Sequence, residues 1–214
     1  MNAGTTGVSG MLSFTSGTTS SGSSGLIELK TGDATNGKAG DILLSVGEGD
    51  TVQGGHFVIT SGKSTDLSGG HVSLTSGVGT TKSSGSILLK TSNAGTSGVS
   101  GFLSFMTGTT SNGDSGLISF RTGSATSGKG GSIFTTVGSG TTGAGGDVVL
   151  SAGETTADST IGGSISVTAG LASSATDARG GHIVHTAGTG ASGTGGFMSL
   201  ATGYGTATSS GSIL

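Results

Sequence analysis

Apolar and polar residues alternate through short segments that recur about every fifteen residues along the chain. Each segment starts at an anchor glycine; the second residue after it is always apolar, the fourth nearly always, and the sixth is small. Gly116-Leu-Ile-Ser-Phe-Arg-Thr-Gly123 is typical. Alternation of this kind, ended by glycine, predicts a β-strand with one side turned inward. A helix would need a period near 3.6, which such dense glycine opposes.

The repeat returns roughly fourteen times, with anchors at Gly10, Gly25, Gly40, Gly55, Gly70, Gly85, Gly101, Gly116, Gly131, Gly146, Gly163, Gly181, Gly196 and Gly211. Only Thr135 and His185 interrupt the apolar fourth position. Because one short coil cannot bury its own apolar side, similar coils are expected to stack. The sequence therefore predicts an all-β fold over residues 1–214: one continuous β-solenoid of about fourteen coils, with parallel strands, a thin core and no separate domains.

Glycines also follow each predicted strand, at Gly17, Gly32, Gly47, Gly62 and their equivalents, where a sharp turn is expected to need positive φ. The small residues after them predict a second, shorter strand. A longer repeat is visible as well, because a block of six coils near residues 2–92 is partly duplicated from residue 93.

The two ends of the chain suggest assembly. No polar capping segment covers either end, so the chain is expected to be a piece of a longer repeat protein or to dock head to tail on its own copies. The filament interpretation is preferred, with an axial interface formed by Gly4, Gly10, Leu12, Gly211, Ile213 and Leu214.

The outward side of the main strand also carries apolar residues, usually one at either the first or the third position after the anchor. A fully solvated face does not need them, although scattered surface apolar residues are common. A lateral contact face is predicted at Met11, Leu43, Val58, Phe102, Phe134, Val149 and Phe197.

A row of threonines supports an alternative function. The predicted second strand would place them outward in one line, as a flat surface that could bind ice or carbohydrate, although threonine also simply suits an exposed strand. The row consists of Thr35, Thr65, Thr80, Thr126, Thr141, Thr156 and Thr206.

Composition and charge narrow the remaining classes. The chain has 48 Gly, no Pro and no Cys, which excludes collagen and a disulfide framework. A net charge of -3 offers no basic face for nucleic acid, and no apolar run is long enough to span a membrane. His56 and His71 share an outward position but lack a third ligand, so no metal site, cofactor or enzymatic activity is expected. The expected partner is another copy of the chain.

The repeat Ser-Gly-x-Ile-x-(Leu or Phe)-x-Thr-Gly-x-Ala-Thr-Ser-Gly, as in residues 115–128, resembles the Gly/Ser/Thr-rich arrays of very large surface or secreted proteins of microalgae. It is also similar to repeats of some viral fibre proteins. The resemblance implies an extended structural role outside the cell or at its surface, and it transfers no functional residues.

Overall fold

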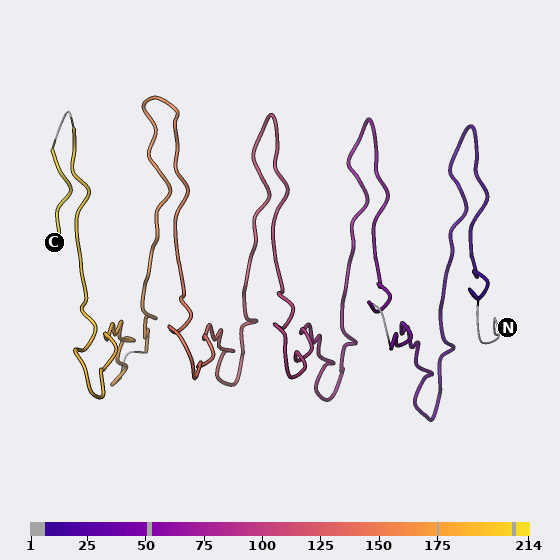
Figure 1. Cartoon of the computed structure of the whole chain (residues 1–214), viewed down its shortest axis with the longest axis horizontal. Helices are drawn as coiled ribbons and strands as arrows, with labels where there is room; N and C mark the ends of the chain where they lie inside the picture. The colour runs from indigo at the N-terminus through magenta and orange to yellow at the C-terminus, as the bar shows by residue number, and fades with distance from the viewer. Residues whose placement is uncertain (1–6, 51–52, 175, 207–208) are drawn as a thin grey trace. The chain divides into compact units, whose positions relative to one another are not determined.

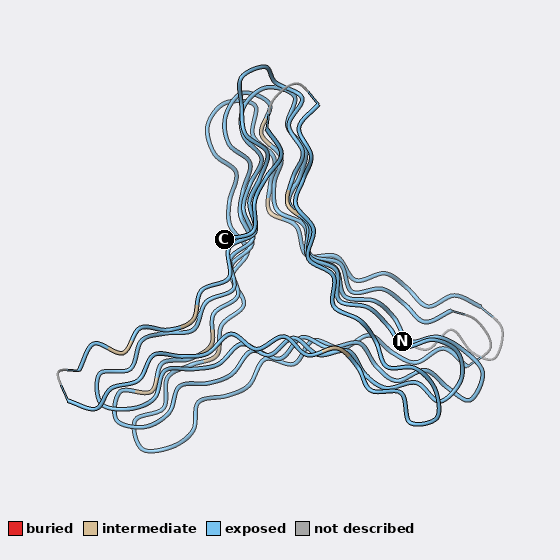
Figure 2. Cartoon of the chain, turned by 90° about the vertical axis from the view of Figure 1, so that its left-hand side faces the viewer, coloured by how far each residue is buried: buried red, intermediate tan, exposed pale blue. Residues whose placement is uncertain are grey.

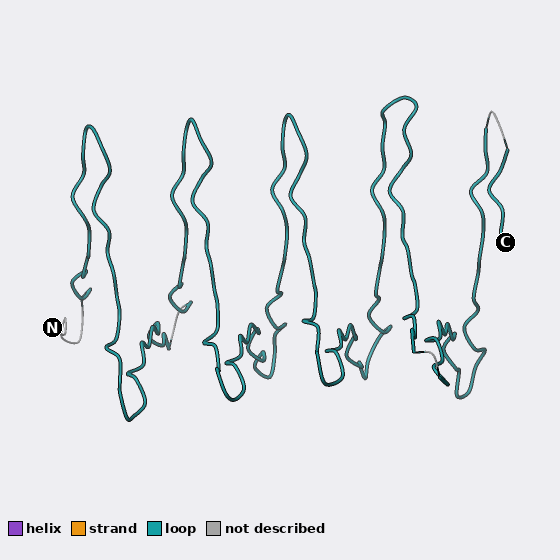
Figure 3. Ribbon diagram, turned by 180° about the vertical axis from the view of Figure 1, so that it is seen from behind, coloured by secondary structure: helices purple, strands orange, loops and turns teal. Residues whose placement is uncertain are grey.

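The computed structural model describes residues 7–50, 53–174, 176–206 and 209–214 of the chain. None of these residues belongs to a helix or a β-strand, and Figure 3 draws all of them as loop. The predicted all-β solenoid with parallel strands is therefore wrong. The predicted fifteen-residue repeat nevertheless recurs in the structure as a series of closed loops.

Each loop closes where the small sixth residue of one segment approaches the anchor glycine of the next. We call this approach a neck, and the residues between its two members a loop. A Cβ added to Gly55 would lie 2.7 Å from Cγ1 of Val46, and one added to Gly131 would lie 3.1 Å from Thr122. The anchor is therefore glycine because the chain passes close to itself at the neck. Figure 1 shows several loops as paired legs joined by a bend.

Hydrogen bonds hold many of the necks closed. At six of them the anchor glycine donates its N–H to the carbonyl of the glycine that ends the preceding segment, as in Gly70 to Gly62 at 2.9 Å and Gly196 to Gly188 at 2.8 Å. At others a hydroxyl is the donor: Thr31 Oγ1 donates to the carbonyl of Gly40 at 3.1 Å. These bonds join residues eight to eleven positions apart, so they are local to one loop.

The bend of the loop is where positive φ is found. Gly22, Gly113 and Gly143 have φ of 103°, 108° and 85°. The predicted positions Gly17, Gly32, Gly47 and Gly62 are not among the positive-φ residues, so that prediction is wrong. The direction of the chain reverses several residues after the segment ends, which leaves the terminal glycine in ordinary backbone geometry.

No described residue is buried, and Figure 2 shows only short stretches of intermediate exposure. The accessible surface is 21351 Å², whereas a compact protein of 20.0 kDa has about 8,700 Å² and an unfolded chain about 29,000 Å². The predicted thin core is therefore absent from the described residues. Six of the partly covered residues are sixth-position members of necks: Ser16, Thr31, Ser76, Ala152, Ala169 and Ala187.

Two properties of the sequence explain why closed loops replace a sheet. Glycine weakens a strand because it loses most entropy on ordering and offers no side chain to pack. Serine and threonine hydroxyls bond the nearby backbone, which competes with pairing between strands. Both residue types fill the stretch between segments, and the hydroxyl of Thr31 bonds the neck backbone directly.

The chain divides into two compact units, Met1–Ser104 and Phe105–Leu214. The first contains the necks from Ser16–Gly25 to Thr91–Gly101, and the second those from Thr107–Gly116 to Thr202–Gly211. Every neck thus lies within one unit.

Candidate association surface

The two sides of each segment differ in exposure, although neither is buried. Phe134 in a third position is 87% exposed, whereas its neighbour Ile133 in a second position is 59% exposed. The same contrast separates Leu43 from Ile42, at 87% and 48%. Period-two alternation therefore does mark two sides of an extended segment. The predicted inward side has only partial cover, because no second layer lies against it in the described residues.

The residues predicted to form the lateral face lie on the more exposed side. All seven, namely Met11, Leu43, Val58, Phe102, Phe134, Val149 and Phe197, are largely exposed. They are contributed by separate segments in both units, four by the first and three by the second. Their side chains offer apolar area to any partner that reaches the chain.

The residues predicted for the axial interface are also accessible. Leu12, Ile213 and Leu214 are exposed, and a Cβ on Gly10 would meet nothing within 4 Å. Gly211 is an anchor whose N–H donates to the carbonyl of Gly203 at 2.9 Å. Gly4 lies outside the described residues.

The residues of the predicted threonine row do not lie on a β-strand. Thr35, Thr65, Thr80, Thr126, Thr141 and Thr206 lie where the loops bend, and Thr156 directly precedes a bend. All seven are exposed, but each sits on its own loop and not on a second strand. The predicted second strand is therefore wrong for these residues.

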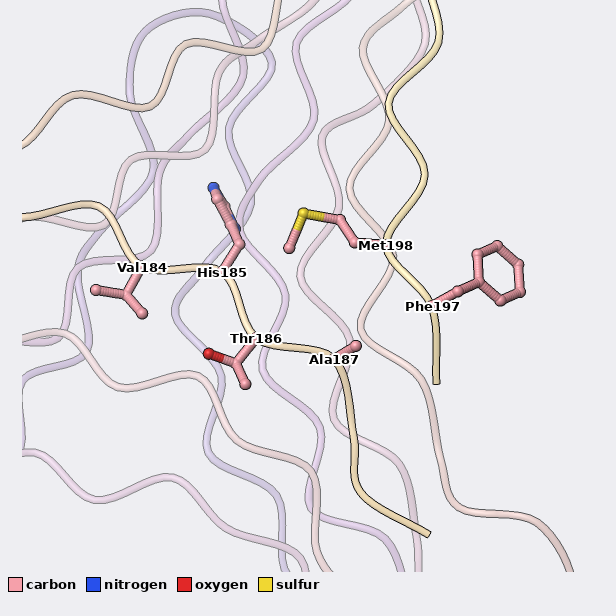
Figure 4. Close-up of a pocket in the computed structure, with 6 residues that line it drawn as sticks. All are labelled: Val184, His185, Thr186, Ala187, Phe197 and Met198. Atoms are coloured by element: carbon pink, nitrogen blue, oxygen red, sulfur yellow. The ribbon is translucent and has the colours of Figure 1, made fainter. Parts of the chain in front are cut away.

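A shallow hollow of about 390 Å³ lies on the inward side of the second unit. Its lining consists of Val184, His185, Thr186, Ala187, Phe197 and Met198. Figure 4 shows the side chains of His185 and Met198 pointing into the space between their segments, whereas Val184 and Phe197 point away. His185 thus takes the inward position that the repeat predicts, beside a methionine. No carboxylate lines the hollow, so the imidazole lacks the partner that acid–base chemistry would require.

One aromatic pair joins consecutive segments on the inward side. The rings of Phe105 and Phe120, both in fourth positions, lie edge to face with centroids 6.1 Å apart and an interplanar angle of 86°. This geometry is favourable and contributes about 0.5–1.5 kcal/mol beyond area burial. Inward side chains of neighbouring segments can therefore meet without a sheet.

Charged groups do not gather into a catalytic or metal site in the part of the chain that is described. No three His, Asp or Glu side chains there come close enough to hold a metal ion, and His56 and His71 are exposed. The only ion pair among these residues joins Lys38 Nζ to Asp41 Oδ2 at 2.7 Å. The same residues contain no helix of the length and hydropathy that a membrane crossing needs.

The sequence did not lead us to predict a hydroxyl group that accepts a backbone hydrogen bond in every third loop. Thr19, Ser64, Thr110 and Thr155, about 45 residues apart, lie two residues after the glycine that ends their segment. Each accepts a backbone N–H from within its own loop: from Ser21 at 3.2 Å, Leu67 at 3.0 Å, Asn112 at 3.2 Å and Ala157 at 3.3 Å. Such hydroxyl turns fix the loop bend. Comparing every third repeat, instead of consecutive ones, would have revealed this signal.

Comparison of the chain with protein-family models, with curated proteins and with solved structures finds no match.

Proposed function

We propose that this chain is a structural repeat protein whose copies associate with one another, end to end and through their outward apolar side chains, into filaments outside the cell or at its surface. The observation that carries the proposal is the exposure of the large apolar residues together with the absence of any buried residue in the described chain. A chain that buries little of its own apolar surface is stabilised by burying it against a partner.

The free energies of burial and association favour several contacts per copy over a single contact. Full burial of one large apolar side chain contributes about 1.5–3 kcal/mol, so the seven lateral residues would contribute roughly 10–20 kcal/mol. Association costs about 4–15 kcal/mol in lost freedom of motion. A contact between two copies is therefore marginal, whereas a copy inside a filament contacts more than one neighbour, and these contacts add through effective concentration. This arithmetic favours extended assemblies.

The repetition itself supports growth from either end. Necks, outward residues and inward residues recur at similar intervals along the chain. A copy added at one end would therefore contact a segment similar to those that neighbour each other within the chain. Leu12, Ile213 and Leu214 are exposed and would be covered by such growth. Ice or carbohydrate binding stays a prediction; in the structure the threonines of the row lie at, or next to, the bends of separate loops.

The test is assembly of the purified chain, measured by sedimentation velocity over a series of concentrations and by electron microscopy. We expect particles far larger than 20.0 kDa that grow with concentration. The variant Phe102→Ser, Phe134→Ser and Phe197→Ser should assemble much less. Its matched control, Ser104→Thr and Ser199→Thr, changes outward positions without removing apolar area and should behave like the parent. A parent chain that stays monomeric throughout would refute the proposal.

A further inference from the structure

Exposed charges in the loops are followed in the sequence, one to six residues later, by exposed apolar residues, in two kinds of pair. The acid–apolar pairs are Asp66 with Leu67, Asp114 with Leu117, and Asp158 with Ile161. The cation–apolar pairs are Lys82 with Leu88, Lys129 with Phe134, and Arg179 with Val184. Each acid lies in a loop that has one of the hydroxyl turns described above, and each cation lies in the loop that follows. Both kinds therefore recur in every third loop, at intervals of 44 to 50 residues.

Local hydrogen bonds hold the loops of the acid–apolar pairs in place. The N–H of Leu67 donates to Ser64 Oγ at 3.0 Å, which fixes the backbone beside Asp66. Around Asp158, Thr160 Oγ1 donates to the carbonyl of Ala157 at 2.8 Å. A surface that is ordered before binding loses less entropy when a partner arrives.

The loops of the cation–apolar pairs are closed at their necks. The loop that carries Lys82 is closed by the bond from Gly85 N to Gly77 O at 2.9 Å. In the loop of Arg179, Gly181 N donates to Gly170 O, also at 2.9 Å. The position of each cation relative to the following segment is therefore restrained.

Within the described residues, these six charges take part in no ion pair. The single ion pair among the described residues joins Lys38 and Asp41, so none of the six charges named above takes part in one. Lys63 lies in the loop of Asp66 and Asp177 in the loop of Arg179, and neither forms an ion pair with its neighbour. The apolar member of every pair is largely exposed as well.

We infer that the acid–apolar pairs of one copy bind the cation–apolar pairs of a second copy. This inference rests on the proposed self-association and names the two surfaces that meet. A second copy fits because it offers opposite charge, apolar area and a similar spacing of 44 to 50 residues at once. Charges of opposite sign set the register, while the leucine, isoleucine, valine and phenylalanine side chains supply apolar burial. The two surfaces differ, so their contact is heterologous and allows open-ended growth.

A charge-swap experiment tests the inference. The acidic variant carries Lys82→Glu, Lys129→Glu and Arg179→Glu; the basic variant carries Asp66→Lys, Asp114→Lys and Asp158→Lys. Each variant alone juxtaposes like charges and should lose the assemblies seen for the parent chain by sedimentation velocity. Mixed in equal amounts, the two variants again present opposite charges at every contact, and assembly should return.

The control variant Lys30→Glu, Lys90→Glu and Arg121→Glu makes the same change in net charge at the fifth positions of three segments, outside the loops that carry the six charges, and should assemble like the parent. If the control loses assembly equally, or if the mixture of swapped variants stays monomeric, the inference is overturned. If the parent assembles and both swapped variants do too, self-association stands and only this choice of surfaces fails. A monomeric parent chain refutes the proposed function itself.

Discussion

A methyl group at the neck between Ala152 and Gly163 should open that loop. In the substitution Gly163→Ala, the new Cβ would lie 3.0 Å from the backbone N of Gly153, 3.2 Å from its carbonyl oxygen and 3.3 Å from Cβ of Ala152. Two of these neighbours are backbone atoms, which no rotamer change can move aside. The neck must widen, and the bond from the N–H of residue 163 to the carbonyl of Gly153, now 2.9 Å, should weaken or break.

The free-energy cost of the substitution is the sum of the contributions that change when the neck opens. A hydrogen bond contributes about 0.5–1.5 kcal/mol net, and crowding a packed contact costs about 1–3 kcal/mol. Replacing glycine by alanine restores about 0.4–1 kcal/mol by restricting the unfolded chain. The neck is partly exposed and can relax, so we expect a net loss of about 1–2 kcal/mol, a factor of about 5–30 in the closing equilibrium.

Hydrogen exchange of the amide at position 163, followed by NMR, measures this equilibrium directly. The substitution should speed exchange by that factor. Gly162→Ala is the matched control, because its Cβ would meet only the carbonyl oxygen of Gly153 at 3.8 Å. Unchanged exchange in Gly163→Ala, or equal acceleration in both variants, would show that close approach at the neck is not what requires glycine.

Three further outcomes are expected. Gly146→Ala should open its neck because the new Cβ would lie 2.8 Å from Cγ1 of Val137. Adding Val137→Ala should restore closure, and a double-mutant cycle of amide exchange rates would measure this coupling. Thr110→Ala should speed exchange of the Asn112 amide about 2- to 12-fold by removing its acceptor at 3.2 Å, while Thr110→Ser should not. Assembly of the parent chain should weaken as salt is added, because exposed charges are screened within about 10 Å at 0.1 M; sedimentation velocity at rising ionic strength would detect the change.

The sequence predicted the repeat and the two sides of each segment, but not their pairing. Alternation around Ile133 and Phe134 correctly separated the less exposed from the more exposed side. It could not say whether segments pair in sheets, since period two describes a single extended chain as well as a paired strand. The sequence interpretation therefore took two-sidedness as evidence for a core that the described residues lack.

The roles of the glycines were the hardest to predict. The anchor Gly55 and the terminal glycine Gly62 look alike in sequence, yet a Cβ would clash only at Gly55 and would meet nothing within 4 Å at Gly62. The difference depends on which residue lies opposite, here Val46, and spacing along the chain does not reveal that. The exposure of the outward apolar residues was easier to predict, because it does not depend on which segments lie beside each other.

Closure of each loop by its own neck has a consequence for engineering and for evolution. The stretches 153–162 and 170–180 already hold extra residues while Gly163 and Gly181 keep their bonds to Gly153 and Gly170. A foreign peptide grafted at a bend should likewise leave neighbouring loops undisturbed, and whole repeats can be gained or lost without redesigning the remainder. Loops of different length can thus share one type of neck, as the stretches that precede Gly163 and Gly181 show.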